Sequence, residues 1–546
     1  MQFLLGRNVG VCRSAFWCLH ARDIQKRRGA HLMGECAATD TLHAVVANPR
    51  AVSAIYQTPY GYSVDPVSVG DAPVFALPPV YPEWLGGGVF QAAHPVRFPY
   101  VVGEMARGIA TPEMVIAASQ AGFLGFYGSA GLRPTDIDTG LQRIKAGLGA
   151  EAALFGANLI HTPQQPGYED AVVDLFLSHG VGRVSASAYM KLSAPIVRYM
   201  ASGLLRDAAG RVQRTTHVFA KVSRAEVARQ FMAPPPAAML RDMVASGAIT
   251  AEQAELAAGL PVASDITAEA DSGGHTDNRP ALTVFSSILG ARDEVCVEHG
   301  LAPDTIRVGL AGGIGTPQAA SAAFHLGAAY VLTGSINQAC VESGLSLAGR
   351  EALARATPSD VMMAPAADMF EQGVKVQVLK RGSLFGPRAE KLYRLYREGA
   401  SYESLQDKDR AWLEDILGQS FDEAWAATQA YLAGVAPKSA ARGAADTKVR
   451  FALVCRRYLF MGAQWAREGD EAHRSDYQIW CGPAMGAFND WVAGSVLEPL
   501  AARTIAQVGW NILEGAARHT RISQLRGLGI TLPLSLQAYT PKLMAV

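Results

Sequence analysis

The sequence has 546 residues, of which 49% are hydrophobic and 18% are charged. This apolar content excludes a disordered chain, because such a chain has too little hydrophobic surface to bury. Lys+Arg and Asp+Glu number 49 each, so the zero net charge gives no electrostatic reason to expect a nucleic acid or a membrane as partner. At this length we expect several domains, or one large barrel with added segments.

The cysteine and histidine patterns exclude several classes of site. Seven cysteines occur without a CxxC motif, which predicts a reduced, cytoplasmic protein without a disulfide framework. The 12 histidines include no HExxH motif, and no serine stands in a GxSxG motif. We therefore expect no metal site, no zinc protease and no α/β-hydrolase.

Two segments resemble targeting or membrane sequences at first sight. Residues 1–32 hold six basic residues against Asp23, and Arg7 interrupts the apolar start. We expect a disordered arm, or sequence upstream of a start at Met33, and not a secretory signal. Residues 308–341 contain no Asp, Glu, Lys or Arg, but glycines, Pro317 and amide residues interrupt them, which favours buried elements over a membrane span.

Residues 1–95 are predicted to be an N-terminal arm followed by a loop-rich lead-in over 50–95. From Val96 onward, short apolar runs alternate eight times with helical segments, which is typical of parallel strands covered on both faces. The expected strands are Phe98–Met105, Phe123–Tyr127, Phe155–Ile160, Arg183–Tyr189, His217–Val222, Ile266–Asp271, Arg307–Ala311 and Tyr330–Thr333. The count of eight predicts an α/β fold, a (β/α)8 TIM barrel over 96–345; an open doubly wound sheet would show the same alternation.

Helix starts between these strands are marked by capping patterns. Thr111-Pro112 and Thr316-Pro317 each place a capping hydroxyl before a proline. Ser223 with Glu226, and Thr250 with Gln253, have the spacing of capping boxes. More than 40 residues separate the fifth and sixth strands. They predict a helical insertion at about 224–262, with helices near 237–246 and 251–259.

Residues 346–546 are expected to form a helical C-terminal extension. Its predicted helices are 388–398, 408–417, 421–433, 448–465 and 496–519, and Ser439–Thr447 is expected to be a solvated linker. The extension is predicted to be either a cap over the barrel mouth or a separate interaction domain.

Candidate functional residues follow the predicted strands, where barrel active sites lie. Gly312-Gly313 and Gly334-Ser335 follow the last two strands and could hold a phosphate through backbone N–H groups, although two tight turns would look the same. His275 follows two glycines near acidic residues, as expected for proton transfer, unless it only orders its loop. Glu104 is left open as a site residue or as an ion pair with Arg107. Asn158 and Lys221 could reach a cofactor or pair inside the barrel.

These motifs together resemble the PfaD family of enoyl reductases. The segments that carry the resemblance lie between residues 95 and 530: EADSGGHTDNRP (269–280), AGGIGTP (311–317), TGSINQAC (333–340), APAADMFEQGVKVQVLKRGSLF (364–385) and DYQIWCGPAMGAFNDWVAGSVLE (476–498). The resemblance implies a nitronate monooxygenase-like barrel with FMN at its mouth and NADPH as hydride donor. It implies His275 as the catalytic residue, and as cofactor-binding residues Met105, Ala106, Asn158, Lys221, Gly273, Gly274, Gly312, Gly313, Gly334 and Ser335.

By the same resemblance, the substrate is an α,β-unsaturated acyl thioester on an acyl carrier protein, reduced in trans in polyketide or polyunsaturated fatty acid biosynthesis. A nitronate monooxygenase-type oxidase and a flavin-bearing docking subunit are the alternatives. Residues 374–397 hold seven basic residues against Glu390, so a helical stripe is predicted as a candidate dock for the acidic carrier: Arg388, Lys391, Arg394 and Arg397. A homodimer is a candidate oligomeric state.

Overall fold

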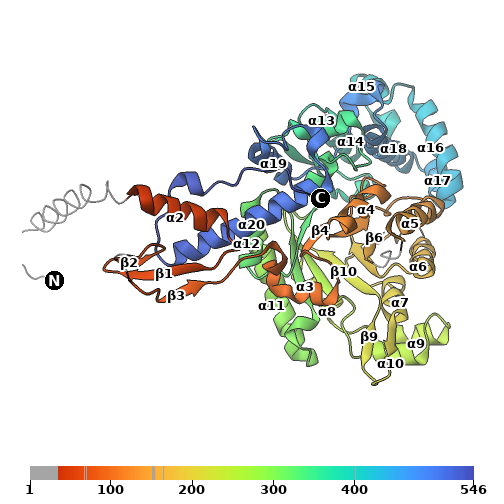
Figure 1. Ribbon diagram of the computed structural model, residues 1–546. Helices are drawn as coiled ribbons and strands as arrows, with labels where there is room; N and C mark the ends of the chain where they lie inside the picture. The colour runs from red at the N-terminus through yellow and green to blue at the C-terminus, as the bar shows by residue number, and fades with distance from the viewer. Residues whose placement is uncertain are drawn as a thin grey trace, which may run out of the picture. The chain divides into compact units, whose positions relative to one another are not determined.

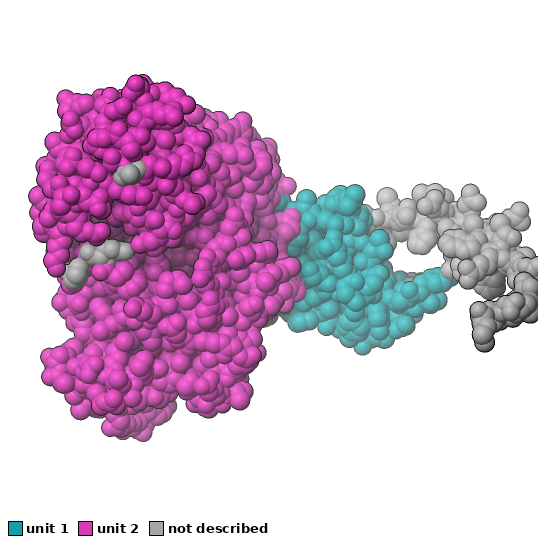
Figure 2. Space-filling model, turned by 180° about the vertical axis from the view of Figure 1, so that it is seen from behind, with its two compact units in different colours: residues 1–81, 517–539 teal, residues 82–516, 540–546 magenta. Residues whose placement is uncertain are grey.

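The computed structural model describes residues 35–66, 68, 70–149, 154–163, 165, 167–399 and 401–545, with side chains from residue 41 on. The predicted arm over residues 1–32 lies outside this part of the chain. Two compact units are distinguished (Figure 2). The smaller unit joins the described residues up to Tyr81 to Ala517–Tyr539, and the larger one joins Pro82–Ala516 to the segment from Thr540.

The smaller unit contains a short antiparallel sheet where loops were expected. Helix α2 (Glu35–Ala47) precedes strands β1 (Ser53–Thr58), β2 (Gly61–Ser63) and β3 (Phe75–Leu77), which pair in the order β2-β1-β3. The C-terminal part of helix α20 (Ile505–Gly527) completes the core of this unit, where Ile522 packs with Val46 and Ile55. Three strands of three to six residues carry too little periodicity for sequence to reveal them.

The predicted TIM barrel is confirmed (Figure 1). Eight parallel strands close in the order β10-β11-β13-β14-β4-β5-β6-β7, which excludes the open sheet. All eight coincide with predicted runs, within a few residues at their ends: β4 (Tyr100–Val102), β5 (Leu124–Tyr127), β6 (Phe155–Ile160), β7 (Arg183–Ser187), β10 (His217–Val222), β11 (Asp265–Glu269), β13 (Arg307–Ala311) and β14 (Val331–Thr333).

Helices connect the strands, as the capping patterns indicated. They are α4 (Pro112–Gln120), α5 (Pro134–Leu148), α6 (Tyr168–His179), α7 (Ala194–Ser202), α8 (Ala225–Met232), α11 (Ala281–His299) and α12 (Pro317–His325). The hydroxyls of Thr111 and Thr316 accept N-capping hydrogen bonds, and Thr250 forms a capping box with Gln253. The predicted box at Ser223 is wrong, because its hydroxyl donates to Asp277 Oδ2 (2.6 Å) instead of capping α8.

The insertion and the extension are largely helical. Helices α9 (Ala237–Ala245) and α10 (Ala251–Ala257) form the predicted insertion between β10 and β11, and a hairpin of β8 (Leu204–Arg206) and β9 (Val212–Arg214) precedes β10. The extension contains α13 (Leu347–Ala354), α14 (Phe385–Glu398), α15 (Asp407–Leu417), α16 (Phe421–Val435), α17 (Pro437–Ala445), α18 (Thr447–Glu468) and α19 (Ala484–Val492). The expected linker over Ser439–Thr447 is wrong, since α17 occupies most of it. Gly443 packs against Trp425 there.

One sheet that involves the extension was not predicted from the sequence. Strands β15 (Val361–Pro365) and β16 (Lys375–Leu379) pair with each other, and β16 also pairs with β12 (Gly274–His275), which follows barrel strand β11. The extension is therefore bonded directly to a barrel loop. No helix of the described residues is long and apolar enough to cross a membrane.

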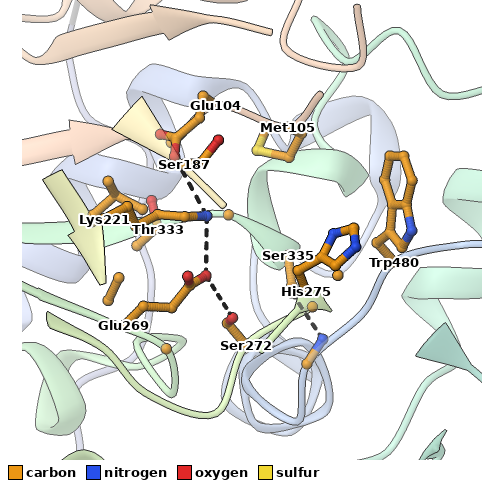
Figure 3. Close-up of a pocket in the computed structure, with 18 of the residues that line it drawn as sticks. Glu104, Met105, Ser187, Lys221, Glu269, Ser272, His275, Thr333, Ser335 and Trp480 are labelled. Atoms are coloured by element: carbon orange, nitrogen blue, oxygen red, sulfur yellow. Dashed lines mark hydrogen bonds and ion pairs between the residues drawn. The ribbon is translucent and has the colours of Figure 1, made fainter. Parts of the chain in front are cut away.

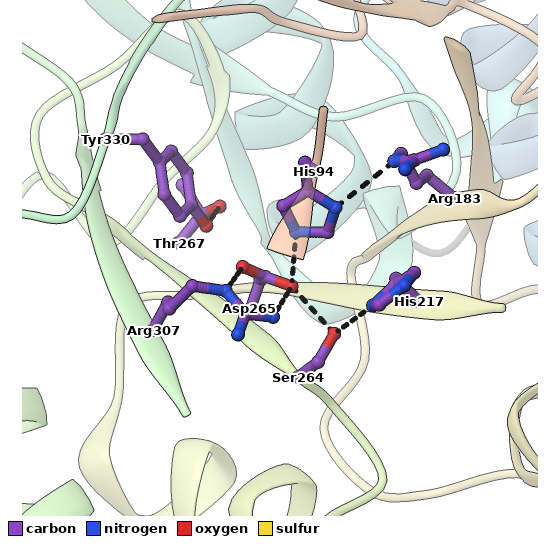
Figure 4. A network of polar contacts seen from close by, with 8 residues as sticks. All are labelled: His94, Arg183, His217, Ser264, Asp265, Thr267, Arg307 and Tyr330. Atoms are coloured by element: carbon purple, nitrogen blue, oxygen red, sulfur yellow. Dashed lines mark hydrogen bonds and ion pairs between the residues drawn. The ribbon is translucent and has the colours of Figure 1, made fainter. Parts of the chain in front are cut away.

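A buried polar network closes the barrel at the amino ends of its strands (Figure 4). Asp265, the first residue of β11, accepts two hydrogen bonds from Arg307, the first residue of β13, at 2.7 and 2.9 Å. His94 Nε2 lies 3.0 Å from Asp265 Oδ2, and its Nδ1 accepts from Arg183 Nε (3.2 Å). His94, His217 and Asp265 cluster tightly enough for a metal ion. However, both ring nitrogens of His94 and both oxygens of Asp265 already have protein partners. Their hydrogen bonds are therefore accounted for within the protein, and the network has a structural role at this end of the barrel.

Candidate active site

A pocket opens at the opposite end of the barrel, where the strands end (Figure 3). Its empty space, including the open mouth, is about 1070 Å³. Every predicted site residue lines it: Met105, Ala106, Asn158, Lys221, Gly273, Gly274, His275, Gly312, Gly313, Gly334 and Ser335. The structure thus brings residues spread over more than 200 positions to one pocket, and their roles there stay predictions.

The glycine turns after β13 and β14 leave room for an anion. Gly313 has a φ of +77°, and a Cβ placed on it would meet no protein atom within 4 Å. The nearest atom to a Cβ on Gly334 would be Met105 Sδ, at 3.9 Å. Among the described residues, neither backbone N–H donates a hydrogen bond to the protein. Unpaired N–H groups beside open space suit a phosphate, since nothing blocks its approach.

Neighbouring Gly312 has a different role. Its φ is +84°, and a Cβ there would lie 2.7 Å from the Ala270 carbonyl carbon. This glycine is required for the close contact between the ends of β13 and β11.

A lysine between two glutamates forms the polar floor of the pocket (Figure 3). Lys221 Nζ lies 3.0 Å from Glu269 Oε1 and 3.4 Å from Glu104 Oε1. Burial disfavours the charged lysine, but the two carboxylates outweigh it and raise the pKa of Lys221. Ser272 Oγ donates to Glu269 (2.8 Å), whereas neither oxygen of the buried Glu104 accepts a hydrogen bond from a described residue. The side chain of Glu104 is only 1% exposed, and Lys221 is the cation that the structure places beside it.

Contacts in the structure bear on two alternatives left open by the sequence. Glu104 does not pair with Arg107, whose guanidinium stacks on the Phe460 ring at 3.8 Å. Asn158 is used inside the barrel, because its amide donates to the Ser185 carbonyl (3.0 Å) and to Ser187 Oγ (2.9 Å). Asn158 also lines the pocket, so its contact with a cofactor stays a prediction.

His275 is held at the pocket mouth by the extension. Its backbone pairs in β12 with Val376 of β16. Its Nε2 lies 3.2 Å from Asp368 Oδ1, with about a third of the histidine side chain exposed. Burial disfavours the ionised aspartate, but the hydrogen bond from His275 and the charge of Arg456 outweigh it, so the pKa of Asp368 is lowered.

The extension also supplies part of the pocket wall, which the sequence did not reveal. Trp480, Gly482 and Ala484 line the pocket. Trp480 is anchored by its carbonyl, which accepts from Gln338 Nε2 (2.6 Å), and by a β-bridge to Val378. Since these residues lie about 150 to 210 positions after the barrel glycines, only the segment 476–498 of the family resemblance pointed to them. The extension is thus built into the site and is not a separate interaction domain.

The predicted basic stripe is wrong for two of its four members. Arg388 forms an ion pair with the buried Asp476, and Lys391 pairs with Asp409 (3.0 Å) and lies over the Trp412 ring. Both cations are therefore used within the extension. Only Arg394 and Arg397 are exposed.

Comparison with known proteins gives relatives over most of the chain. A polyunsaturated fatty acid synthase protein of Thraustochytrium sp. is 42% identical over 449 residues, covering 81% of this chain and 30% of that protein. The polyketide biosynthesis protein PksE of Bacillus subtilis is 39% identical over 436 residues, covering 80% of this chain and 56% of PksE. The chain thus spans less than two thirds of either relative.

A solved structure and a protein-family model also match parts of the chain. The enoyl reductase domain of MlnA, from the macrolactin biosynthesis cluster of Bacillus amyloliquefaciens, has a TM-score of 0.77 and 36% identity, covering 82% of this chain and 99% of that domain. Residues 400–477 match the inserted helical domain of [acyl-carrier-protein] S-malonyltransferase. Because the MlnA domain is matched over nearly its whole length, the chain belongs to the PfaD family, with that enoyl reductase domain as a fellow member.

Proposed function

We propose that the protein is an FMN-dependent enoyl reductase that acts in trans. Its substrate would be an α,β-unsaturated acyl thioester on an acyl carrier protein, with NADPH as the hydride donor. The pathway would be polyketide or polyunsaturated fatty acid assembly, as the names of its relatives suggest. The observation that carries the proposal is the pair of open glycine turns beside His275 in a barrel 36% identical to an enoyl reductase domain.

The residues present fit FMN. The free N–H groups of Gly313 and Gly334 would hold its phosphate, and Met105, Ala106 and Asn158 would contact the rest of the cofactor. FMN would supply hydride transfer from NADPH to the β-carbon of the substrate. Lys221 would stabilise negative charge on a bound group.

His275 would serve the substrate half of the reaction. Reduction of the double bond also requires a proton at the α-carbon and polarisation of the thioester carbonyl. A histidine at the pocket mouth, partly exposed and paired with a carboxylate, can donate a hydrogen bond and transfer a proton. We assign both tasks to His275.

The partner would be an acyl carrier protein, in keeping with relatives that are synthase proteins. Arg394 and Arg397 are the exposed part of the predicted dock and would contact the acidic carrier. Reversing both charges should raise KM for a carrier-bound enoyl chain in a salt-dependent way and leave a free thioester mimic unaffected. An equal effect on both substrates would reject this dock.

Steady-state assays test the proposed activity. The purified protein should contain one FMN per chain, and it should oxidise NADPH only when a crotonyl thioester is added, forming the butyryl thioester. Oxidation of a nitronate with consumption of O2, and no thioester reduction, would instead support a nitronate monooxygenase. Bound FMN with neither activity would indicate a docking subunit.

A further inference from the structure

We infer that Asp368 is the positioning residue of the active-site histidine: it holds Nε2 of His275 as an N–H donor and leaves Nδ1 as the nitrogen that serves the substrate. The inference rests on the proposed function. It assigns a role to a residue of the extension that does not line the pocket and that lies 93 positions from His275.

Both residues of the hydrogen bond between His275 and Asp368 are held in place by their surroundings. On the histidine side, β12 and β16 pair Gly274 with Gln377 and His275 with Val376, so the backbone cannot shift without breaking the sheet. The side chain of Gln377 strengthens this junction, because its Nε2 donates to Asp271 Oδ1 (2.6 Å) and to the Ser272 carbonyl (2.8 Å). The position of the imidazole is therefore set by the extension.

On the carboxylate side, Asp368 lies between β15 and the short helix Phe370–Gln372, which carries the buried Phe370. Arg456 of α18 donates to the carbonyl of the preceding residue, Ala367 (2.8 Å), and pairs with Glu371 (3.3 Å). Arg456 thus fixes the backbone next to Asp368 and also favours its ionised form. An ionised carboxylate accepts hydrogen bonds and cannot donate one, so Nε2 of His275 must carry the hydrogen.

This assignment determines which nitrogen transfers a proton. When both nitrogens are protonated, Nδ1–H can donate to the thioester carbonyl and then give its proton to the substrate, which gains one hydride and one proton per turnover. The neutral imidazole that remains keeps its hydrogen on Nε2, where Asp368 accepts it. Solvent restores the Nδ1 proton. Asp368 selects the tautomer left after proton transfer, the role that a carboxylate has in hydrolase triads.

Other charged groups of the pocket are already engaged. Asp271 accepts from Gln377, and Lys221 lies between Glu269 and Glu104 on the floor. Asp368 is the group for which the structure shows a hydrogen bond to the His275 ring. Its removal therefore takes away the hydrogen bond that the structure shows to that ring.

The test compares Asp368→Ala, Asp368→Glu and a matched control, Asp470→Ala. Asp470 Oδ2 lies 3.1 Å from His473 Nδ1, with exposed fractions of 35% and 36%, and neither residue lines the pocket, so the control removes another Asp–His pair. In the FMN-loaded enzyme, Asp368→Ala should slow reduction of the enoyl thioester at least about tenfold, less than the ~10²–10⁴-fold of losing a proton-transfer group. Flavin reduction by NADPH should be unchanged, and Asp368→Glu should restore most of the lost rate.

A second readout does not depend on activity. Long-range ¹H–¹⁵N NMR, with the His275 signals assigned by their loss in His275→Gln, should show the Nε2–H tautomer in the parent protein and in Asp368→Glu. Asp368→Ala should shift the signals toward a mixture of tautomers. Unchanged tautomer and rate in Asp368→Ala, or an equal loss in Asp470→Ala, would overturn the inference. A parent enzyme that binds FMN but reduces no thioester would refute the proposed function instead, and the NMR result would still decide the role of Asp368.

Discussion

The backbones of Gly273 and Gly482 are in close contact at the rim of the pocket. A Cβ on Gly273 would lie 2.8 Å from the Cys481 nitrogen, and one on Gly482 would lie 3.0 Å from the Gly273 nitrogen. Gly273 follows barrel strand β11, whereas Gly482 belongs to the segment that carries Trp480. This contact joins the barrel to the extension at the active site, so Gly273, expected to bind cofactor, also has a packing role.

Alanine at either glycine should therefore loosen this junction. We expect Gly273→Ala and Gly482→Ala each to lower the free energy of unfolding by about 1–3 kcal/mol, the usual cost of overpacking a tight site. Chemical denaturation measures the effect. Gly290→Ala is the matched control, since a Cβ there would meet nothing within 4 Å and the position is helical, so it should be neutral or stabilising. Equal stability of all three variants would contradict the close contact.

Gly313→Asp should expel the flavin. The substitution places a carboxylate where the phosphate would bind, and like charges repel strongly in a partly buried site. The cofactor content is read from the absorbance of the purified protein. Gly247→Asp is the control, because Gly247 has a similar φ of +74° and open surroundings but lies outside the pocket. Full flavin content in Gly313→Asp would remove the glycine turn from the cofactor site.

His275→Ala separates the two half-reactions. The variant should bind FMN and accept hydride from NADPH at the parent rate, but it should lose enoyl reduction by ~10²–10⁴-fold, as expected when a proton-transfer group is removed. Stopped-flow absorbance follows each half-reaction in turn. If both proceed at the parent rate, His275 only orders its loop.

Lys221→Met should destabilise the barrel, because it leaves Glu104 and Glu269 without their cationic partner. Removing one partner of a buried ion pair typically costs about 3–5 kcal/mol, because the remaining charges are uncompensated. Adding Glu269→Gln should recover part of that loss. Lys375→Met is the control: its pair with Glu390 is more than a third exposed on both sides and should contribute ~0–1 kcal/mol. Equal losses at Lys221 and Lys375 would contradict the buried cluster.

The free energy of unfolding should decrease as the pH is lowered past about 6.5, because of the network at the closed end of the barrel. Burial lowers the pKa of His94, and lowers that of His217 to about 2. Below the ordinary histidine pKa of about 6.5, the unfolded chain therefore binds protons that the folded chain does not. Each histidine then costs up to ~1.4 kcal/mol per pH unit.

A substitution tests this pH dependence. Urea denaturation at pH 7.5 and pH 5.5 should show a drop in stability that is about 1 kcal/mol smaller in His217→Gln than in the parent protein. Gly290→Ala, which changes no titratable group, should retain the parent drop. The same pH dependence in His217→Gln and in the parent would contradict this assignment.

The sequence predicted the parts of the fold that have strong local signals. Apolar strands buried on both faces, such as Arg307–Ala311, and threonine caps such as Thr111 are recognisable within a few residues. The site residues were found because barrel sites lie at strand ends and because the family motifs fall there. Their roles in binding and catalysis remain predictions.

The errors and omissions have physical causes. Ser223 has the spacing of a capping box, but a distant aspartate, Asp277, takes its hydroxyl hydrogen. The charges of Arg388 and Lys391 looked free because their partners lie on other segments. Likewise, the pairing of β12 with β16 joins residues about 100 positions apart, and such contacts leave no local periodicity.

The most direct test of the proposed function is a single-turnover experiment without oxygen. The protein, reduced with one equivalent of NADPH, is mixed in a stopped-flow instrument with an enoyl chain on an acyl carrier protein, and the flavin absorbance is followed. We predict that the flavin reoxidises as the saturated acyl chain forms in equal amount, and that the oxidised flavin of the untreated protein is not reduced by a nitronate. A flavin that stays reduced with the enoyl chain, but whose oxidised form takes electrons from a nitronate and then yields the carbonyl product when O2 is admitted, would contradict the enoyl reductase assignment.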